Sequence, residues 1–258
     1  MFDRFVRTLA PVAGLAMGAM LAGCSVDMDI GGMDGVTMAE LDTSAGAPDS
    51  ISLVGPDNVI ITRGETFAVD VTGDTDAVDA VRFKLDGDEL AIGRAEGIGR
   101  DIGRAQITLV LPSLRAIAIA GSGDVRSDHM VGAGKVSIAG SGDARVTNLV
   151  TESLDISIAG SGNVEGSGRT SSLDVSVAGS GSTRLADVTV NSADISIMGS
   201  GDVAFASDGT VEASIMGSGN VDVTGRATCE VSAMGSGKLR CKVSRAGDGA
   251  ETERTPAG

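Results

Sequence analysis

The chain has 258 residues and a formal net charge of −15, with 35 acidic and 20 basic side chains, no Trp, no Tyr and one His. This negative charge argues against nucleic-acid binding, which requires a basic face. The composition also offers little for a sugar-stacking platform or a histidine-based metal site.

The N-terminus is typical of a secretory signal peptide. Arg4 and Arg7 precede an apolar run, Leu9–Ala22, that is too short to span a bilayer comfortably. The run leads into Leu-Ala-Gly-Cys, which resembles the cleavage site of a bacterial lipoprotein signal. We therefore predict that residues 1–23 are removed and that the thiol of Cys24 is acylated, with an ordinary secretory signal as the alternative.

The remaining chain has no second apolar run of transmembrane length, so we expect an extracytoplasmic protein held at the membrane by its lipid. Ser25, directly after the cysteine, favours the outer membrane of a Gram-negative bacterium, by resemblance to proteobacterial sorting. Residues 24–50 are rich in Asp, Gly, Met and Ala and are predicted to be a flexible tether. Residues 245–258 are predicted to be a disordered tail.

A five-residue motif, IAGSG and its near copies, occurs seven times between Ile119 and Gly237. The steps between successive copies are 19, 20, 19, 20, 18 and 18 residues. A nearly fixed period of this length is typical of a solenoid. Residues 115–244 are therefore predicted to form a stack of coils, with one motif in each.

Alternating apolar and polar residues precede each motif, as in a half-buried strand, and a shorter alternating strand follows it. The apolar positions are predicted to face one shared interior; four of them, from successive repeats, are Ile156, Val175, Ile195 and Ala213. The sequence thus predicts an all-β, single-domain parallel β-helix with about 18–20 residues per coil.

The two glycines of each motif are predicted to form a tight corner between the strands, because glycine adopts backbone angles that cost other residues energy. An Asp or Asn often follows and suits a turn, since its side chain accepts hydrogen bonds from nearby amides. A phosphate-binding loop would instead need a single strand–loop–helix unit. The corner glycines are Gly121, Gly123, Gly140, Gly142, Gly160, Gly162, Gly179, Gly181, Gly199, Gly201, Gly217, Gly219, Gly235 and Gly237.

Residues 51–114 keep strand signals but lack the glycine corner. Alternating runs cover Asn58–Val71, Ala80–Arg94 and Ala105–Leu114. We predict less regular first coils here, or a cap that closes one end of the stack, because a terminal strand otherwise has a free edge.

Three runs in this half, followed by the repeated corners, carry a family resemblance. They are VIITRGETFAVDVTGD, LDGDELAIG and ITLVLPSLRAIAIAGSGDV. In order and spacing, from roughly Ile51 to Val243, the chain resembles the head GIN domain family of putative auto-transporter adhesins. The resemblance implies a β-helical, secreted or lipid-anchored bacterial protein of undefined biochemical role, with no catalytic residues to transfer.

One exposed repeat position is acidic in five successive coils and would form a column at strand spacing. Ca²⁺ is the one candidate ligand, because it favours several carboxylate oxygens, but no EF-hand or RTX-type loop is present. A solvated face that keeps the solenoid soluble is the favoured interpretation. The column comprises Asp155, Asp174, Asp194, Glu212 and Glu230.

Cys229 and Cys241 fall at inward positions of the last coil. In an oxidising compartment they are predicted to form a disulfide, with two buried free thiols as the alternative. His129 has no recognisable ligand constellation around it and is assigned no role.

These features predict a non-enzymatic cell-envelope lipoprotein with an adhesin-like or structural role and an envelope protein or glycan as partner. The alternative is a cation-binding or carbohydrate-active protein that uses the acidic face. No cofactor other than a weakly held Ca²⁺ is predicted. Self-association is a third hypothesis, through an apolar strip that comprises Met198, Met216 and Met234.

Overall fold

The computed structural model describes residues 33–44, 46–97 and 102–242. The predicted signal peptide, Cys24 with its acylation, and the predicted tail lie outside these residues. None of the helices among the described residues is both long and apolar enough to cross a membrane.

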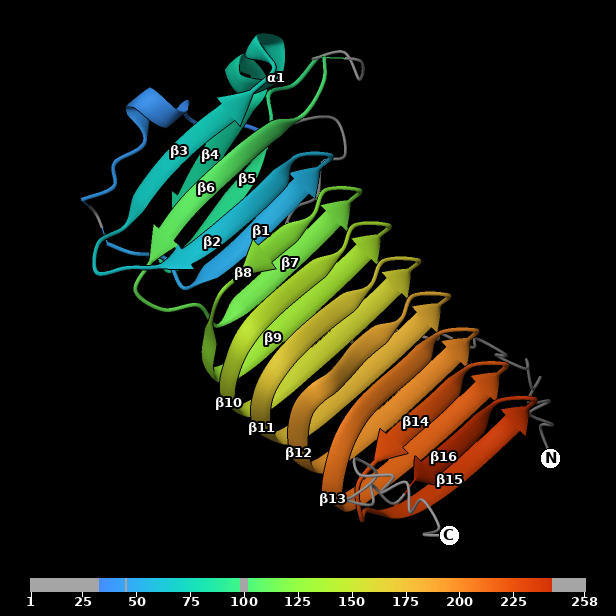
Figure 1. Cartoon of the computed structure of the whole chain (residues 1–258). Coiled ribbons are helices and arrows are strands. Elements are labelled where there is room, and N and C mark those ends of the chain that lie inside the picture. Colours follow the sequence, from blue (N-terminus) through green and yellow to red (C-terminus); the bar gives the residue numbers. More distant parts are fainter. Residues whose placement is uncertain (1–32, 45, 98–101, 243–258) are drawn as a thin grey trace, which may run out of the picture. The chain divides into compact units, whose positions relative to one another are not determined.

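The described chain winds into a parallel β-solenoid of about seven turns with an irregular N-terminal region, which confirms the predicted fold class (Figure 1). Each coil contributes to two facing layers. Sheet one holds the strands that end at a glycine corner, including β7 (Ala116–Gly121), β9 (Met130–Gly140) and β15 (Thr228–Gly235). Sheet two holds the strands that follow a corner, including β8 (Val125–Ser127), β14 (Asn220–Thr224) and β16 (Lys238–Lys242).

Four long strands belong to both layers, because each starts in sheet two and bends into sheet one (Figure 1). They are β10 (Ala144–Gly160), β11 (Val164–Gly179), β12 (Thr183–Gly199) and β13 (Asp202–Gly217). They pair in parallel, each with the next, so the same repeat position recurs at the same place in every coil.

The parallel register carries the apolar side chains into one core. Ile156 lies opposite Val175, Val175 opposite Ile195, and Ile195 opposite Ala213. The first three are 0% exposed and Ala213 is 5% exposed. The predicted shared interior is therefore confirmed, and burial of these aliphatic columns is the main favourable contribution to the fold.

The glycine corners form a second column, at the edge where the chain passes from sheet one to sheet two. The first glycine of each motif has a φ between 129° and 133°. The serine amide that follows donates to the carbonyl of the first glycine one coil earlier; for example, Ser161 N lies 2.9 Å from Gly140 O. The corners therefore bond to one another through the backbone.

The expectation that residues 51–114 contain no such corner is wrong. β1 (Ser50–Gly55) pairs with β7 in register, and Gly55 lies opposite Gly121 with a φ of 124°. The amides of Ser122 and Gly123 both donate to the Gly55 carbonyl, at 3.2 and 3.0 Å. The sequence hides this corner because Pro and Asp stand where the later motifs have Ser and Gly.

The N-terminal end of the solenoid is closed by a cap. In sheet two, β2 (Asn58–Arg63) and β6 (Ala105–Leu111) continue the parallel order, and β3 (Ala68–Gly73) pairs with β6 in the antiparallel sense. In sheet one, β5 (Glu89–Arg94) pairs with β1 and β4 (Val81–Asp86) runs antiparallel to β5. The short helix α1 (Thr75–Ala80) buries Ala77 and Ala80 at this end.

Part of the predicted tether lies against this cap. Val36 forms an isolated antiparallel bridge with Phe83 of β4, and the 3-10 helix η1 (Met38–Glu40) follows. The Met33 amide donates to the Arg94 carbonyl at 2.8 Å. Residues 33–41 are therefore in contact with the folded domain, whereas we predicted a free linker there.

Candidate binding surfaces

The acidic column runs along the outer face of sheet one. Asp155, Asp174 and Asp194 lie opposite one another in successive strands, and Glu212 and Glu230 continue the row. All five side chains are exposed. Partial burial, and then the charges of Asp155 and Asp194, raise the pKa of Asp174 above its ordinary value.

We expect Asp174→Asn to stabilise the fold at pH 7. An acid whose pKa is raised by folding destabilises the folded state when ionised, and this cost disappears as the pH falls through the folded and then the unfolded pKa. Because the side chain is exposed, the gain is a few tenths of a kcal/mol, or about 1 °C in Tm. Thermal unfolding at pH 7 and below pH 3 measures it, with Glu152→Gln, an exposed acid outside the column, as control. A gain that persists at low pH would contradict the explanation.

The carboxylates of the column stand in a row and do not surround a common point. Among the residues that the structure describes, no three His, Cys, Asp or Glu side chains are grouped so that they could hold a metal ion. Ca²⁺ binding by the column therefore stays a prediction that rests on charge density alone.

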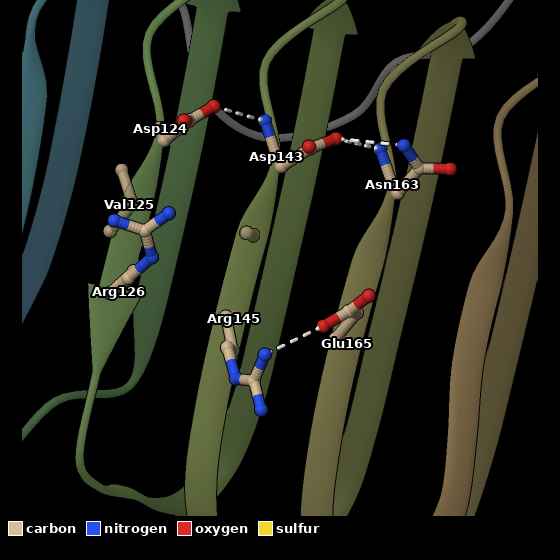
Figure 2. A pocket seen from close by; sticks show the side chains of 8 residues that line it. Asp124, Val125, Arg126, Asp143, Arg145, Asn163 and Glu165 are labelled. Carbon is tan, nitrogen blue, oxygen red and sulfur yellow. Dashed lines mark hydrogen bonds and ion pairs between the residues drawn. The ribbon is translucent and has the colours of Figure 1, made fainter.

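A ladder of side-chain bonds follows the corners on the outside of sheet two (Figure 2). The Asp143 amide donates to Asp124 Oδ1 at 3.1 Å, and the amide and Nδ2 of Asn163 donate to Asp143 Oδ1 at 2.8 and 2.9 Å. Our expectation that these side chains bond nearby amides is corrected, because each accepts from the coil that follows it. The ladder links coils to one another and does not merely close each turn.

Charged side chains on sheet two line a shallow depression beside this ladder (Figure 2). Glu165 lies between two arginines, 3.0 Å from Arg145 and 3.5 Å from Arg184. Arg126 lies beside Arg145 in the parallel register, so two guanidinium groups occupy adjacent coils. The depression can hydrogen-bond a polar or anionic group, but all these ion pairs are exposed and weak.

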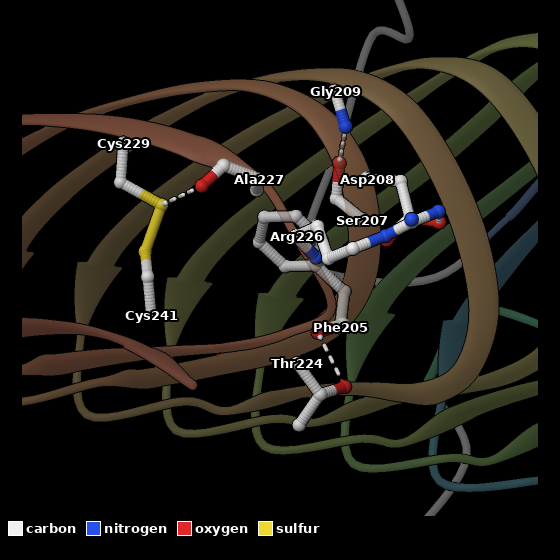
Figure 3. Close-up of a disulfide and its surroundings, with 9 residues drawn as sticks. All are labelled: Phe205, Ser207, Asp208, Gly209, Thr224, Arg226, Ala227, Cys229 and Cys241. Atoms are coloured by element: carbon white, nitrogen blue, oxygen red, sulfur yellow. Dashed lines mark hydrogen bonds and ion pairs between the residues drawn. A yellow bond between two sulfur atoms is a disulfide. The ribbon is translucent and has the colours of Figure 1, made fainter. Parts of the chain in front are cut away.

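Cys229 of β15 and Cys241 of β16 are joined by a disulfide that links the two sheets in the last coil (Figure 3). Their Cα atoms lie 6.8 Å apart. Both occupy interior-type positions, opposite buried Val211 and Val223. Cys229 is nevertheless half-buried and Cys241 exposed, because no further coil covers them among the described residues.

The three methionines form a continuous exposed strip. Met198 lies opposite Met216, and Met216 opposite Met234. Their exposed fractions are 56%, 55% and 72%. Alanines occupy the same position in the preceding coils, so the apolar surface widens toward the C-terminal end of the stack.

His129, which the sequence left without a role, lies in the turn between β8 and β9 and is buried. Its Nδ1 lies 2.7 Å from Asp128 Oδ1, and Asp128 accepts a bond from the Arg63 amide at 3.0 Å. The side chain is 4% exposed, and its Nε2 has no partner among the described residues. Burial of this residue was not predictable, because no apolar alternation surrounds it in the loop before β9.

A family model described as "Putative auto-transporter adhesin, head GIN domain" matches residues 47–227. The chain belongs to this family. Membership confirms the resemblance seen in the sequence and supports an extracytoplasmic or envelope protein for this GIN-domain chain.

Solved structures share the GIN-domain fold. A putative adhesin from Bacteroides fragilis is 20% identical with a TM-score of 0.70, over 76% of this chain and 93% of that chain. A putative lipid binding protein from Parabacteroides distasonis is 23% identical with a TM-score of 0.59, over 75% and 92%. A putative adhesin from Parabacteroides merdae is 17% identical with a TM-score of 0.57, over 76% and 92%. Comparison with curated proteins gives no match.

Proposed function

We propose that this GIN-domain protein is a non-enzymatic lipoprotein of the cell envelope, anchored through Cys24, whose solenoid binds an envelope protein on sheet one. The observation that carries the proposal is the exposed strip of Met198, Met216 and Met234, in register over three coils. Flexible, polarisable methionine side chains suit an adaptable contact with a protein partner. The adhesin names within the family and among the solved relatives support the same class of role.

Retention of envelope proteins by the immobilised chain tests this proposal. We expect Met198→Ser, Met216→Ser and Met234→Ser, combined in one variant, to reduce retention of a specific partner at least about tenfold, because truncating side chains that a partner would bury costs binding energy. The matched control is the Ser196→Ala, Ser214→Ala and Ser232→Ala variant, in which each altered serine lies two residues before one of the methionines, on the same strand and the same exposed face. Equal loss in both variants, or retention of polysaccharide alone, would contradict a protein partner on the strip.

A cation-binding role is the second candidate: partial burial, and then the charges of Asp155 and Asp194, raise the pKa of Asp174, and a bound cation would relieve the repulsion between these carboxylates. Binding of Ca²⁺ would raise Tm in a chelator-sensitive way, and this gain would be lost in Asp174→Asn combined with Asp194→Asn. A carbohydrate-active role requires turnover of an envelope polysaccharide that disappears in Asp174→Ala.

A further inference from the structure

The last coil leaves its interior side chains uncovered. Val231 of β15 lies opposite buried Ala213, yet it is 53% exposed. Ala233, opposite buried Ile215, is also exposed, and Leu239 of β16 is only half-buried although its partner Val221 is fully buried. Within the described residues the apolar core therefore ends in an open face, which we name the terminal face, formed by Val231, Ala233 and Leu239.

The terminal face also has two free strand edges. β15 pairs only with β13, and β16 only with β14, within the part of the chain that the structure describes. Such edges readily pair with further strands. The opposite end contrasts with this, since antiparallel strands and α1 close it.

The composition of the chain beyond Lys242 argues against a cap made by residues 243–258. That segment reads VSRAGDGAETERTPAG, in which Val243 and Pro256 are the only apolar residues larger than alanine. Such a composition offers too little apolar surface to replace a coil. A different occupant is needed to bury the terminal face.

The two edge strands carry opposite charges on their outer faces. β15 bears Glu230, whereas β16 bears Lys238, Arg240 and Lys242. On sheet two the basic side chains of β16 already have an acidic neighbour, because Arg240 and Lys242 lie 3.5 and 3.6 Å from Asp222 of β14. A strand that pairs with β16 should therefore carry acidic side chains, and a strand that pairs with β15 should carry a basic side chain beside Glu230.

We propose that the occupant is a second copy of this chain, with β15 of each copy pairing antiparallel to β16 of the other. A two-fold axis parallel to the strands produces this isologous contact and joins the two apolar cores end to end. Rotation about this axis leaves the position of each residue along the strand direction unchanged, so residues at the same distance from the corner between β15 and β16 meet across the contact. Glu230 lies five residues before Gly235, where β15 ends, and Lys242 lies four residues after Lys238, where β16 starts. Because the two residues are at similar distances from the corner, Glu230 of one copy falls beside Lys242 of the other.

The mass of the purified chain in solution tests the terminal face directly. We expect a dimer, and we expect Val231→Asp to give a monomer, because it places a charge in the joined core. Val231 is already exposed in one copy, so the substitution leaves the fold of that copy intact. The matched control is Val150→Asp on β10, an exposed valine far from the terminal face, which should stay dimeric.

A charge exchange tests the pairing itself. Glu230→Lys alone and Lys242→Glu alone should each weaken the dimer at least about tenfold, and the two together should restore most of the affinity. Pairing of β15 with the other β15 predicts no restoration and would overturn the arrangement. A chain that is monomeric up to about 100 µM would overturn the proposal, as would dimerisation gained only after removal of residues 243–258 or a dimer insensitive to Val231→Asp.

Discussion

Gly160→Ala is expected to destabilise the solenoid by about 4 kcal/mol, a cost found only where a substitution breaks a specific structural requirement. Gly160 has a φ of 133°, and an added Cβ would lie 2.2 Å from the carbonyl oxygen of Gly140 in the preceding coil. The backbone angle and the contact both oppose a side chain. Because that oxygen also accepts the Ser161 amide, the corner cannot move away without losing the bond between coils.

Two other glycines separate these causes. Gly55 at the first corner has a φ of 124°, but no atom of the described residues lies within 4 Å of an added Cβ, so Gly55→Ala measures backbone strain, about 1–3 kcal/mol. Gly162 has no left-handed φ, but its Cβ would lie 2.2 Å from Gly142 O, so Gly162→Ala measures the close contact alone. Urea unfolding of the three variants gives the three free-energy costs. Amide exchange in β10 and β11 is measured as well, because a solenoid can unfold coil by coil. A cost for Gly55→Ala equal to that of Gly160→Ala would refute the role of coil spacing.

The demands on the corner glycines are also the reason why the coils could be predicted from the sequence. Each corner must satisfy the same backbone angle and the same distance to the previous corner, so the same residues recur at a nearly constant step. The strand register and the inward positions, such as Ile156 and Val175, follow directly from that recurrence. The first corner escaped notice because no glycine corner precedes Gly55 in the described part of the stack, and Asp57 could therefore replace a glycine there.

The cap was less predictable because its contacts do not repeat. The six-residue helix α1 and the antiparallel strands β3 and β4 depend on packing against the first coils. Among the candidate surfaces, the sequence located the residues of the acidic column and the methionine strip, because both occupy fixed repeat positions. The uncovered terminal face could not be foreseen, since its residues follow the same alternation as buried ones and differ only in having no further coil beyond them in the part of the chain that the structure describes.

Asp57→Asn is expected to cost about 3 kcal/mol, because it leaves the Arg94 guanidinium, on a side chain that is only 12% exposed, without its counter-ion. Asp57 is 1% exposed and accepts bonds from Arg94 Nε at 2.8 Å and from Arg94 Nη2 at 2.6 Å. The Ala105 amide donates to the same carboxylate at 2.8 Å. The bonds to Asp57 raise the pKa of Arg94, which keeps the guanidinium charged in the folded state. One side chain thus joins the first corner to β5 and to the start of β6.

Chemical denaturation of Asp57→Asn should be read against Glu165→Gln, which removes two exposed ion pairs at 3.0 and 3.5 Å and should cost less than about 1 kcal/mol. If the loss in Asp57→Asn comes from the unpaired guanidinium, adding Arg94→Met should recover part of it, because the buried charge is then gone. Strictly additive losses would mean that the two side chains act independently. A cost for Asp57→Asn no greater than that of Glu165→Gln would mean that the cap does not depend on this pair. Because the pair fixes the corner on which the first regular coil is laid, we expect the lost protection from amide exchange to begin in β1 and β5, before it reaches β10.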